Sequence, residues 1–347
     1  MRKFFAILFL GAVAALAFFC LRIWLRDNRL SNFGERVELY VRPADTAASV
    51  IERLDSSGSL LDRGSLERSF RSKKVGEFLK PGHYVVGAGS SSVYAARMLN
   101  NGWQTPVRLT LSGNLRIKSN IAAKIASQML LDSASVLAAL EDEELLSRFG
   151  ASPRTAFCAL LPSTYEVYWT DGMEEILSKC KASLDAFWSE ENLLKAEALG
   201  LDRESAGVLA SIVSAESNYE KELPLIAGVY LNRLKVGMPL QADPTVAFCF
   251  DYKPRRILKK HLEVDSPYNT YKHAGLPPGP ICCPTMAALQ AVVNPDFGGE
   301  WGRGNLYFCA NSDFSGTHVF ARTLASHNAN ARAFQSELTR RTRAGKK

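Results

Sequence analysis

The sequence predicts an α+β protein with an N-terminal apolar helix, a small α+β module and a mainly helical second half that carries long loops and a β-hairpin. Three observations lead to this prediction. The chain opens with an uncharged apolar run, short alternating strand patterns then interleave with helical ones as far as about Leu111, and helical spacing dominates beyond. A length of 347 residues, 47% hydrophobic and 22% charged, is typical of a folded protein with more than one domain.

The first part, residues 1–27, is predicted to cross a membrane once. Its uncharged run from Phe4 to Leu21 exceeds the roughly 7 to 15 residues of a signal-peptide core and fits the roughly 17 to 25 of a membrane span. We therefore expect a retained anchor, with a cleaved signal as the alternative because two Ala-x-Ala triplets occur in the run. The arginines after the run outnumber the basic residues before it, so charge does not decide the orientation.

Residues 28–115 are predicted to form the small α+β module. The stretch RVELYV places its three apolar residues on one face of a strand, and the next helix carries an apolar stripe from Ala47 to Leu54. A second strand in HYVVG, a second helix and a third strand in TPVRLTL follow. Titratable residues are not concentrated here, so binding or positioning explains the module better than chemistry does.

The rest of the chain is predicted to be mainly helical. Residues 116–200 form a connecting part of interrupted helices. Residues 201–335 hold two helices, the second with Pro224 in its first turn and ended by Gly237, then loops dense in Pro, Gly, Asn and aromatic residues, and a hairpin in NLYFCANSDFSGTHVFA. Such loops on a helical frame suit a long cleft for a polar polymer. The basic tail, residues 336–347, is expected to be solvated and disordered.

Composition excludes some classes of partner and cofactor. The formal net charge of +7 is compatible with an anionic partner, but Lys and Arg are scattered, so we expect no nucleic acid. The seven cysteines are too few for a disulfide scaffold, and the adjacent Cys282 and Cys283 lack the spacing of a zinc site. We therefore predict no metal and no cofactor, and keep a single bridge from Cys249 to one of this pair as a hypothesis.

One carboxylate interrupts an apolar helix face. In ASIVSAES, Ile212 and Val213 lie on the apolar stripe, and Glu216 is the next position on it. An acid in such a place either pairs with an arginine or a backbone N–H group, or it is a general acid whose pKa is raised by apolar neighbours. The second interpretation makes Glu216 the candidate catalytic residue and the loops after it a candidate sugar groove.

The blocks ASIVSAES, GVYLNRLKVGMPLQADPTV, SPYNTYKHAGLPPGPI, LYF, GTHVF and SHN occur in this order. In sequence and order they closely resemble the endolytic murein transglycosylase family, also described as MltG or YceG-like. The resemblance implies a LysM-like module at residues 28–115 and a lytic transglycosylase core at residues 201–335. It also implies cleavage of the bond between N-acetylmuramic acid (MurNAc) and N-acetylglucosamine (GlcNAc) in peptidoglycan glycan strands, which leaves 1,6-anhydroMurNAc ends.

The same resemblance implies a mechanism and a location. Glu216 would be the single catalytic residue, first an acid toward the leaving oxygen and then a base toward the muramyl C6 hydroxyl. The enzyme would lie in the cell inner membrane with its catalytic domain in the periplasm, where it terminates or trims nascent strands. Peptidoglycan synthases or division proteins are candidate partners. Two alternatives stay open: a non-catalytic tethered scaffold that binds peptidoglycan, and a hydrolytic muramidase with Asp243 or Asp251 as second carboxylate.

Five residues in the loops are expected to bind substrate. Asn269 and Tyr271 offer an amide and a phenol, which suit N-acetyl and hydroxyl groups. Gln241, Asp243 and Thr245 either bond the sugar or hold their loop against the candidate catalytic helix. An Asx turn before the following proline is an equally good explanation of Asp243.

Four other polar residues, in the two helices, the hairpin and the segment after it, also have expected roles. Ser217 is expected to bind substrate beside the catalytic acid, because the Glu-Ser pair resembles that of the wider lysozyme-like transglycosylases. Asn232 on the second helix is expected to be structural, and His318 and His327 are expected to lie in the core or behind the site.

The sequence departs from the pattern of the resembled family at a few positions. Ser214 and Ser112 stand where acidic residues are common, and Cys282 and Cys283 replace small or polar residues. The absence of a second acid at position 214 strengthens the assignment of Glu216 as the catalytic residue.

Overall fold

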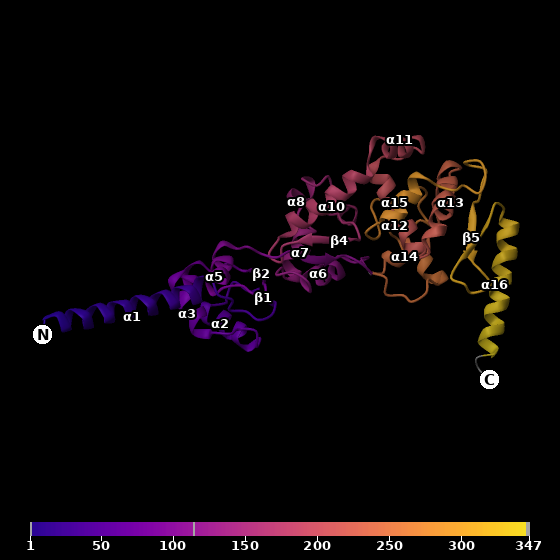
Figure 1. Cartoon of the computed structure of the whole chain (residues 1–347). Helices are drawn as coiled ribbons and strands as arrows, with labels where there is room; N and C mark the ends of the chain where they lie inside the picture. Colours follow the sequence, from indigo (N-terminus) through magenta and orange to yellow (C-terminus); the bar gives the residue numbers. More distant parts are fainter. Residues whose placement is uncertain (1, 114, 345–347) are drawn as a thin grey trace. The chain divides into compact units, whose positions relative to one another are not determined.

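The computed structural model describes residues 2–113 and 115–344 (Figure 1). Contacts within the chain divide it into two units. The first unit runs to Leu109 and includes the short segments Gln128–Leu130 and Glu166–Asp171, and the second unit holds the remainder. Helices and strands are mixed in the chain, which confirms the predicted α+β class.

The N-terminal apolar run forms helix α1 (Arg2–Asn28). Its large apolar side chains are exposed, and its mean hydropathy reaches 2.7. In the described part of the chain it is the one helix long and apolar enough to cross a membrane. The helix therefore fits the predicted single-pass anchor.

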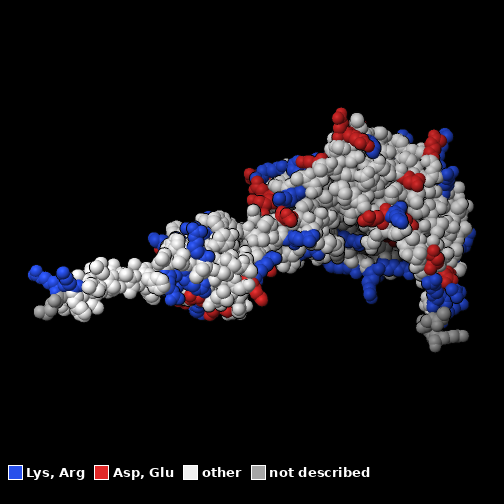
Figure 2. All heavy atoms as spheres, in the orientation of Figure 1, with Lys and Arg blue, Asp and Glu red and all other residues white. Residues whose placement is uncertain are grey.

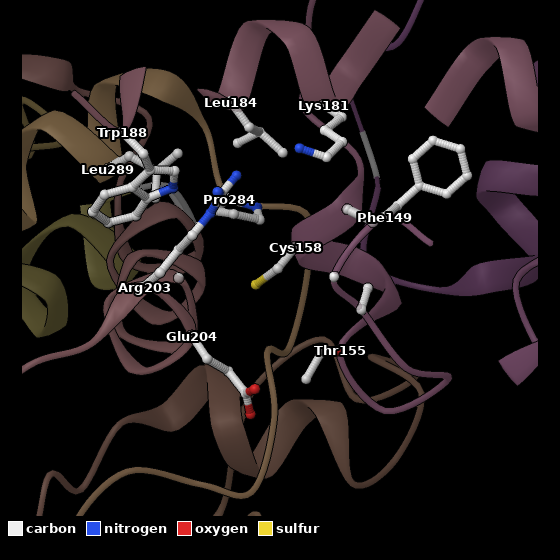
Figure 3. A pocket seen from close by; sticks show the side chains of 14 residues that line it. Phe149, Thr155, Cys158, Lys181, Leu184, Trp188, Arg203, Glu204, Pro284 and Leu289 are labelled. Atoms are coloured by element: carbon white, nitrogen blue, oxygen red, sulfur yellow. The ribbon is translucent and has the colours of Figure 1, made fainter. Parts of the chain in front are cut away.

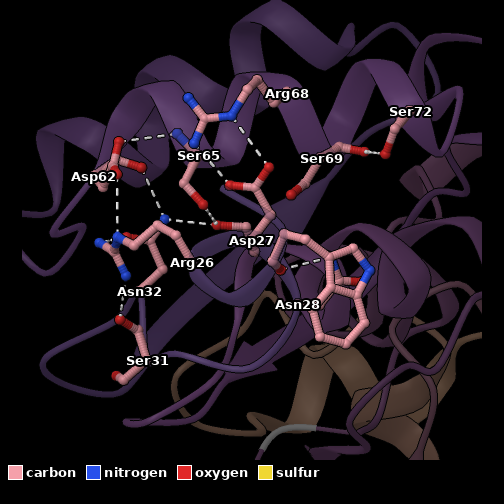
Figure 4. Close-up of polar contacts among 12 residues, drawn as sticks. Arg26, Asp27, Asn28, Ser31, Asn32, Asp62, Ser65, Arg68, Ser69 and Ser72 are labelled. Atoms are coloured by element: carbon pink, nitrogen blue, oxygen red, sulfur yellow. Dashed lines mark hydrogen bonds and ion pairs between the residues drawn. The ribbon is translucent and has the colours of Figure 1, made fainter. Parts of the chain in front are cut away.

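The last turn of α1 is bonded into the first unit (Figure 4). Arg26 donates to Asp62 Oδ2 at 3.1 Å, and Arg68 donates to the two carboxylate oxygens of Asp27 at 2.7 and 3.1 Å. Asp62 also caps helix α3 (Arg63–Ser72), and the backbone N–H that it accepts there, together with Arg26, lowers the pKa of the Asp62 carboxyl. The end of α1 is thus part of the fold of the first unit.

A two-stranded antiparallel sheet forms the centre of the first unit. Strand β1 (Val37–Val41) pairs with β2 (Gly82–Val86), and Leu39 lies opposite Tyr84. Alternate residues of β1 are buried, as the pattern of RVELYV predicts. The helices that cover the sheet, besides α3, are α2 (Ala47–Ser56), α4 (Val75–Phe78) and α5 (Ser92–Asn101). The apolar stripe predicted for α2 is buried against them.

The second unit is mainly helical, as predicted. Its helices are α6 (Lys118–Ala126), α7 (Ser133–Ala139), α8 (Glu143–Ser147), α9 (Ala156–Ala159), α10 (Met173–Phe187), α11 (Glu190–Ala198), α12 (Arg203–Glu216), α13 (Leu223–Lys235), α14 (Asp243–Phe248), α15 (Met286–Val293) and α16 (Leu324–Ala344). The predicted hairpin of this unit is β5 (Tyr307–Ala310) with β6 (His318–Ala321). Elsewhere in the chain, β3 (Val107–Thr110) pairs with β4 (Thr164–Val167) in a short sheet, and most of β3 belongs to the first unit.

Helices α12, α13 and α15 pack together around the main core of the second unit. On α12, Leu209, Ile212 and Val213 are buried in this core, so the apolar stripe read from the sequence is confirmed. Helix α13 starts with proline in its first turn and ends before Gly237, whose φ is +71°, again as predicted. The core fixes the direction in which α12 delivers its last residue, Glu216.

The expectation of a disordered tail is wrong for the residues described, because α16 continues to Ala344. Arg340 donates to Glu337 at 2.7 Å and Arg341 donates to it at 2.8 Å, which are the favourable i,i+3 and i,i+4 pairings of a helix. Basic side chains in the last turn also complement the helix dipole. The two arginines remain exposed, as expected of a solvated segment.

Candidate active site

Glu216 is the last residue of α12 and is partly exposed, whereas the helix is buried from Ala206 to Val213. Tyr230, one of the residues of α13 that face the core, donates its hydroxyl hydrogen to Glu216 Oε1. The ring of Tyr230 is held edge-on by Phe308 of the hairpin, with ring centroids 5.9 Å apart. The carboxyl group therefore has one oxygen fixed by the protein and the other available to a ligand.

The environment of Glu216 raises the pKa of its carboxyl group to about 7. The main cause is burial among apolar groups, and the negative charge of Asp243 adds to it. The hydrogen bond from Tyr230 and the positive charges of Arg233 and Arg116 act in the opposite direction. At neutral pH the group is therefore present in both protonation states, as a residue that must give and take a proton requires.

Glu216 opens onto a cavity of about 350 Å³. Two helices, the loop before α14, the hairpin and the start of α16 contribute to its walls. Besides Glu216, Tyr230 and Arg233, its walls include Gln241, Asp243, Tyr271, Tyr307 and His327. The cavity thus combines aromatic surface with amide, carboxyl and phenol groups, a mixture suited to a sugar.

Three of the predicted substrate contacts line this cavity. Tyr271 donates its hydroxyl to Asp243 Oδ1 at 2.6 Å, and burial with this carboxylate raises the pKa of the Tyr271 phenol. Asp243 begins α14 and does not form the Asx turn considered for it. Gln241 has a left-handed backbone with φ of +48°, uncommon for a residue with a side chain, and its side chain is exposed.

Two other predicted contacts, Thr245 and Asn269, are fully buried behind the cavity. Thr245 Oγ1 donates to Ala242 O at 2.7 Å and lies 2.8 Å from the hydroxyl of Thr270. The amide of Asn269 donates to Leu262 O and to another loop carbonyl at 2.8 and 2.9 Å. Their polar groups are used within the chain, so the structure does not bring these two side chains to the cavity and places them as supports of its loops.

Ser217 is the C-cap residue that follows α12, and its hydroxyl accepts the backbone N–H of Tyr219 at 3.0 Å, so it shapes the turn after Glu216. Asn232 is buried and bonds three backbone groups of the segment before the hairpin, which confirms its structural role. His318 is likewise structural, because it binds the carboxylate of Glu222 through Nδ1 at 3.0 Å and through its backbone N–H at 2.7 Å.

Tyr230 and Arg233 are residues that sequence reasoning missed. Arg233 is buried and donates to Leu306 O at 2.7 Å and Leu240 O at 2.6 Å, so it ties α13 to the hairpin and to the loop before α14. The signal was present in GVYLNRL, where these two polar residues are three positions apart and so share a helix face. Their role depends on partners far along the chain, which no local pattern shows.

His327, expected to lie in the core or behind the site, contributes to the cavity wall. Its ring stacks on Tyr307, with centroids 5.3 Å apart, and its Nδ1 atom is buried without a hydrogen-bond partner among the described residues. Burial, helped by the charge of Arg233, lowers the pKa of His327, so the ring is neutral at pH 7.

A separate cavity of about 220 Å³ lies against the first turns of α12 (Figure 3). Its walls include Cys158, Trp188 and Glu204, and Gly207 allows the close approach, since a Cβ atom there would lie 2.8 Å from Cys158 Sγ. Its two cations, Lys181 and Arg203, both pair with the carboxylate of Asp185. None of the site residues predicted from the sequence lines this cavity, so the candidate active site is the one at Glu216.

Asp251 is exposed, pairs with Lys253 and does not line the cavity of Glu216, so it is unsuited to be a second catalytic carboxylate. Cys249, Cys282 and Cys283 are free thiols, which contradicts the hypothesis of a bridge among them. Among the described residues no cluster of His, Cys, Asp and Glu side chains is placed to hold a metal ion.

Basic side chains gather on one loop of the second unit. The segment 253–260 exposes Lys253, Arg255, Arg256, Lys259 and Lys260, and Figure 2 shows Lys and Arg side chains along the lower edge of this unit. Five of these eight consecutive residues are basic, so the expectation that Lys and Arg are scattered is wrong for this loop. Such a loop attracts an anionic polymer toward the unit.

Comparisons with known proteins identify the family of this chain. Residues 39–333 match the YceG-like family. An endolytic murein transglycosylase of Bacillus subtilis (strain 168) is 32% identical over 231 residues, which are 60% of each chain. An endolytic murein transglycosylase of Streptococcus pneumoniae (strain D39) is 29% identical over 177 residues, which are 49% of this chain and 31% of that protein. The chain thus spans 60% or less of the length of these relatives.

A crystal structure at 2.6 Å of a YceG-like protein from Listeria monocytogenes has the same fold, with a TM-score of 0.56 and 25% sequence identity. The match covers 85% of this chain and 98% of that one. The family match extends from the first sheet into α16 and includes Glu216 and every residue named in its cavity. This chain belongs to the YceG-like family.

Proposed function

We propose that this protein is a membrane-anchored endolytic lytic transglycosylase. It cleaves the bond between MurNAc and GlcNAc in peptidoglycan glycan strands and leaves 1,6-anhydroMurNAc ends, with Glu216 as its catalytic residue. The observation that carries the proposal is a single partly exposed carboxyl group with a pKa of about 7 in a cavity that suits a sugar. The names of the relatives from Bacillus and Streptococcus support it.

The geometry accounts for both halves of the reaction. Because Tyr230 donates to Oε1, the proton of neutral Glu216 is carried on Oε2, from which it passes to the leaving glycosidic oxygen. The resulting carboxylate then takes the proton of the muramyl C6 hydroxyl as that oxygen attacks C1. The substrate's own hydroxyl replaces water, so one carboxylate suffices where a hydrolase needs two.

Asp243 supports a second candidate function, a hydrolytic muramidase, because it shares the cavity with Glu216. Its Oδ1 atom, however, accepts the hydroxyl of Tyr271 at 2.6 Å, so that oxygen is occupied and the carboxylate is held toward Tyr271. A scaffold without activity explains neither the raised pKa of Glu216 nor its partial exposure.

The location follows from the substrate. Helix α1 is proposed to hold the protein in the cell inner membrane as a single-pass anchor, and the catalytic unit lies in the periplasm because peptidoglycan lies there. Tethering restricts cleavage to strands near the membrane, where they are made. The first unit is proposed to act as the LysM-like module, and peptidoglycan synthases or division proteins are the proposed partners.

Mass spectrometry of the released fragments tests the proposal. The full chain in detergent is incubated with purified peptidoglycan, beside the variant Glu216→Gln. We expect ends one water lighter than reducing ends, and none from the variant. Reducing ends would support the muramidase with Asp243, and the absence of products from both proteins would support the scaffold.

A further inference from the structure

A third cavity of the second unit, of about 380 Å³, begins beside Glu216. Ser214 and Asn218 contribute to its wall, and they lie two residues before and two residues after Glu216. The rest of the wall comes from residues 110–113, 115 and 116, the segment 162–164, and Cys282, Cys283 and Thr285. Because Arg116 in this wall is close enough to lower the pKa of Glu216, the cavity lies next to the catalytic carboxyl group.

The walls of this cavity are rich in hydroxyl groups and poor in charge. Its side chains include those of six serines and threonines, and Arg116 is the one charged residue among those that line it in the described structure. The side chains of Ser112, Ser163 and Asn218 form no hydrogen bond with the described residues. The cavity therefore presents hydroxyl and amide groups that are free to donate hydrogen bonds around the cation Arg116, and no carboxylate in its wall pairs with that cation.

Arg116 is half-buried, and within the described residues its guanidinium group has neither a hydrogen bond nor an ion pair. It lies over the ring of Tyr252, with 5.2 Å from Cζ to the ring centroid. Tyr252 is fixed in turn by its hydroxyl, which donates to Ile281 O at 2.7 Å. The guanidinium group is thus partly removed from water on a rigid aromatic surface, with its five N–H groups free for an anion of planar shape.

We propose that this cavity is a substrate subsite that binds a carboxylate of the peptide stem of peptidoglycan, with Arg116 as the ligand of that carboxylate. The inference rests on the proposed function and extends it to the peptide part of the substrate. The sugars of a glycan strand are neutral where a stem is joined by an amide to the lactyl carboxyl of muramic acid, whereas the stem itself carries free carboxylates. The bond to be cleaved joins muramic acid, so its stem leaves the strand close to Glu216 and can enter the neighbouring cavity.

Binding to the inactive full chain tests the subsite without any chemistry. The protein with Glu216→Gln, in detergent, is titrated calorimetrically with the disaccharide GlcNAc-MurNAc carrying a peptide stem, and with the same disaccharide whose lactyl carboxyl is capped as a methylamide in place of the stem. We expect Arg116→Met to weaken binding of the first ligand about tenfold or more, as loss of a charge-assisted bond does, and to leave the second unchanged. Arg116→Lys should restore part of the loss.

A matched control removes the same charge elsewhere. Arg255→Met on the exposed basic loop should leave both affinities unchanged, which separates a subsite from general attraction. Equal loss for both ligands with Arg116→Met, or no loss for either, would overturn the inference, and so would inorganic phosphate binding as tightly as the stemmed disaccharide. Circular dichroism at rising temperature establishes that each variant is folded.

The two proposals fail in different ways. Should the active protein release no fragments while the stem-dependent loss at Arg116 is observed, the subsite stands and the catalytic proposal falls. Should anhydro ends form equally well from strands with and without stems, in the native protein and in Arg116→Met alike, the catalytic proposal stands and the subsite falls. Kinetically, the subsite predicts that Arg116→Met raises KM more for stemmed strands than for strands without stems whose lactyl carboxyls are capped. Any change of kcat that follows from the altered charge near Glu216 should be the same for both substrates.

Discussion

Replacement of Tyr230 by phenylalanine tests the electrostatic balance at Glu216 most directly. The change removes the hydroxyl that donates to Glu216 Oε1 and leaves the buried ring against Phe308 in place. A hydrogen bond to a charged group contributes about 1.5 to 3 kcal/mol. Because this bond stabilises the carboxylate, its loss raises the pKa of Glu216 from about 7 by about 1 to 2.

The sign of the effect on activity follows from the proposed mechanism. Cleavage needs protonated Glu216, so the rate falls as the pH rises through the pKa of that group, and in Tyr230→Phe this falling limb moves to higher pH. The maximal rate decreases, because the carboxyl group loses the contact that orients it. The expected profile is therefore lower than that of the native protein and displaced by about 1 to 2 pH units to the alkaline side.

The assay is the rate at which anhydro ends appear from purified peptidoglycan between about pH 5 and pH 10. Tyr165→Phe is the matched control, since its buried hydroxyl donates to Leu161 O at 2.8 Å and does not contact Glu216. A falling limb that stays in place in Tyr230→Phe, or that moves to lower pH, would refute the reasoning, because either result means that this hydroxyl does not stabilise the carboxylate.

Two further predictions concern stability. In the folded protein the pKa of Glu216 is about 7, compared with an ordinary value of 4.5, so ionisation of this group destabilises the native state by at most about 3 kcal/mol. Glu216→Gln should therefore raise the free energy of unfolding above pH 7 and leave it unchanged at pH 4. Urea denaturation at both pH values checks this, with Glu204→Gln on the same helix as control, and a gain independent of pH would contradict it. A Cβ atom on Gly228 of α13 would lie 2.0 Å from Asp296 O, so Gly228→Ala should lower the free energy of unfolding by about 1 to 3 kcal/mol. Ala227→Gly on the same helix is the comparison. An unchanged unfolding midpoint in Gly228→Ala would show that α13 does not contact the backbone at Asp296.

Local patterns were sufficient to predict most of the elements. Alternation in RVELYV predicted the buried face of β1, and Pro224 and Gly237 predicted the limits of α13, because strand faces and helix ends are set by residues close together in the chain. The position of Glu216 was equally visible, since a carboxyl group on an apolar stripe needs only the helical period to be noticed. The tail was predicted wrongly because Glu337, which pairs with two arginines of α16, was not considered with them.

The surroundings of the site could not be predicted in the same way. Arg233 is placed by the carbonyl of Leu306, which is 73 residues away in the chain, and no sequence period reports such a contact. Thr245 and Asn269 were expected at the groove because their side chains are polar, yet both are used to hold loop backbone. A polar residue in a loop either faces a ligand or satisfies buried backbone groups, and only the fold distinguishes the two.

The position of Glu216 at the end of α12 reconciles two requirements of the proposed reaction. A single residue that first donates and then accepts a proton needs a pKa near the working pH, since a strong acid would not hold its proton and a very weak one would not form the base. Burial alone would raise the pKa of this carboxyl group further, and the hydroxyl of Tyr230 with the charges of Arg233 and Arg116 limits the rise. At the end of a helix, the carboxyl group has apolar neighbours on the side of the core and is accessible to a glycan strand on the other side. An anion bound at Arg116 would cancel one of the limiting charges, so a stem carboxylate in the neighbouring cavity would favour the protonated acid at the moment when substrate is present.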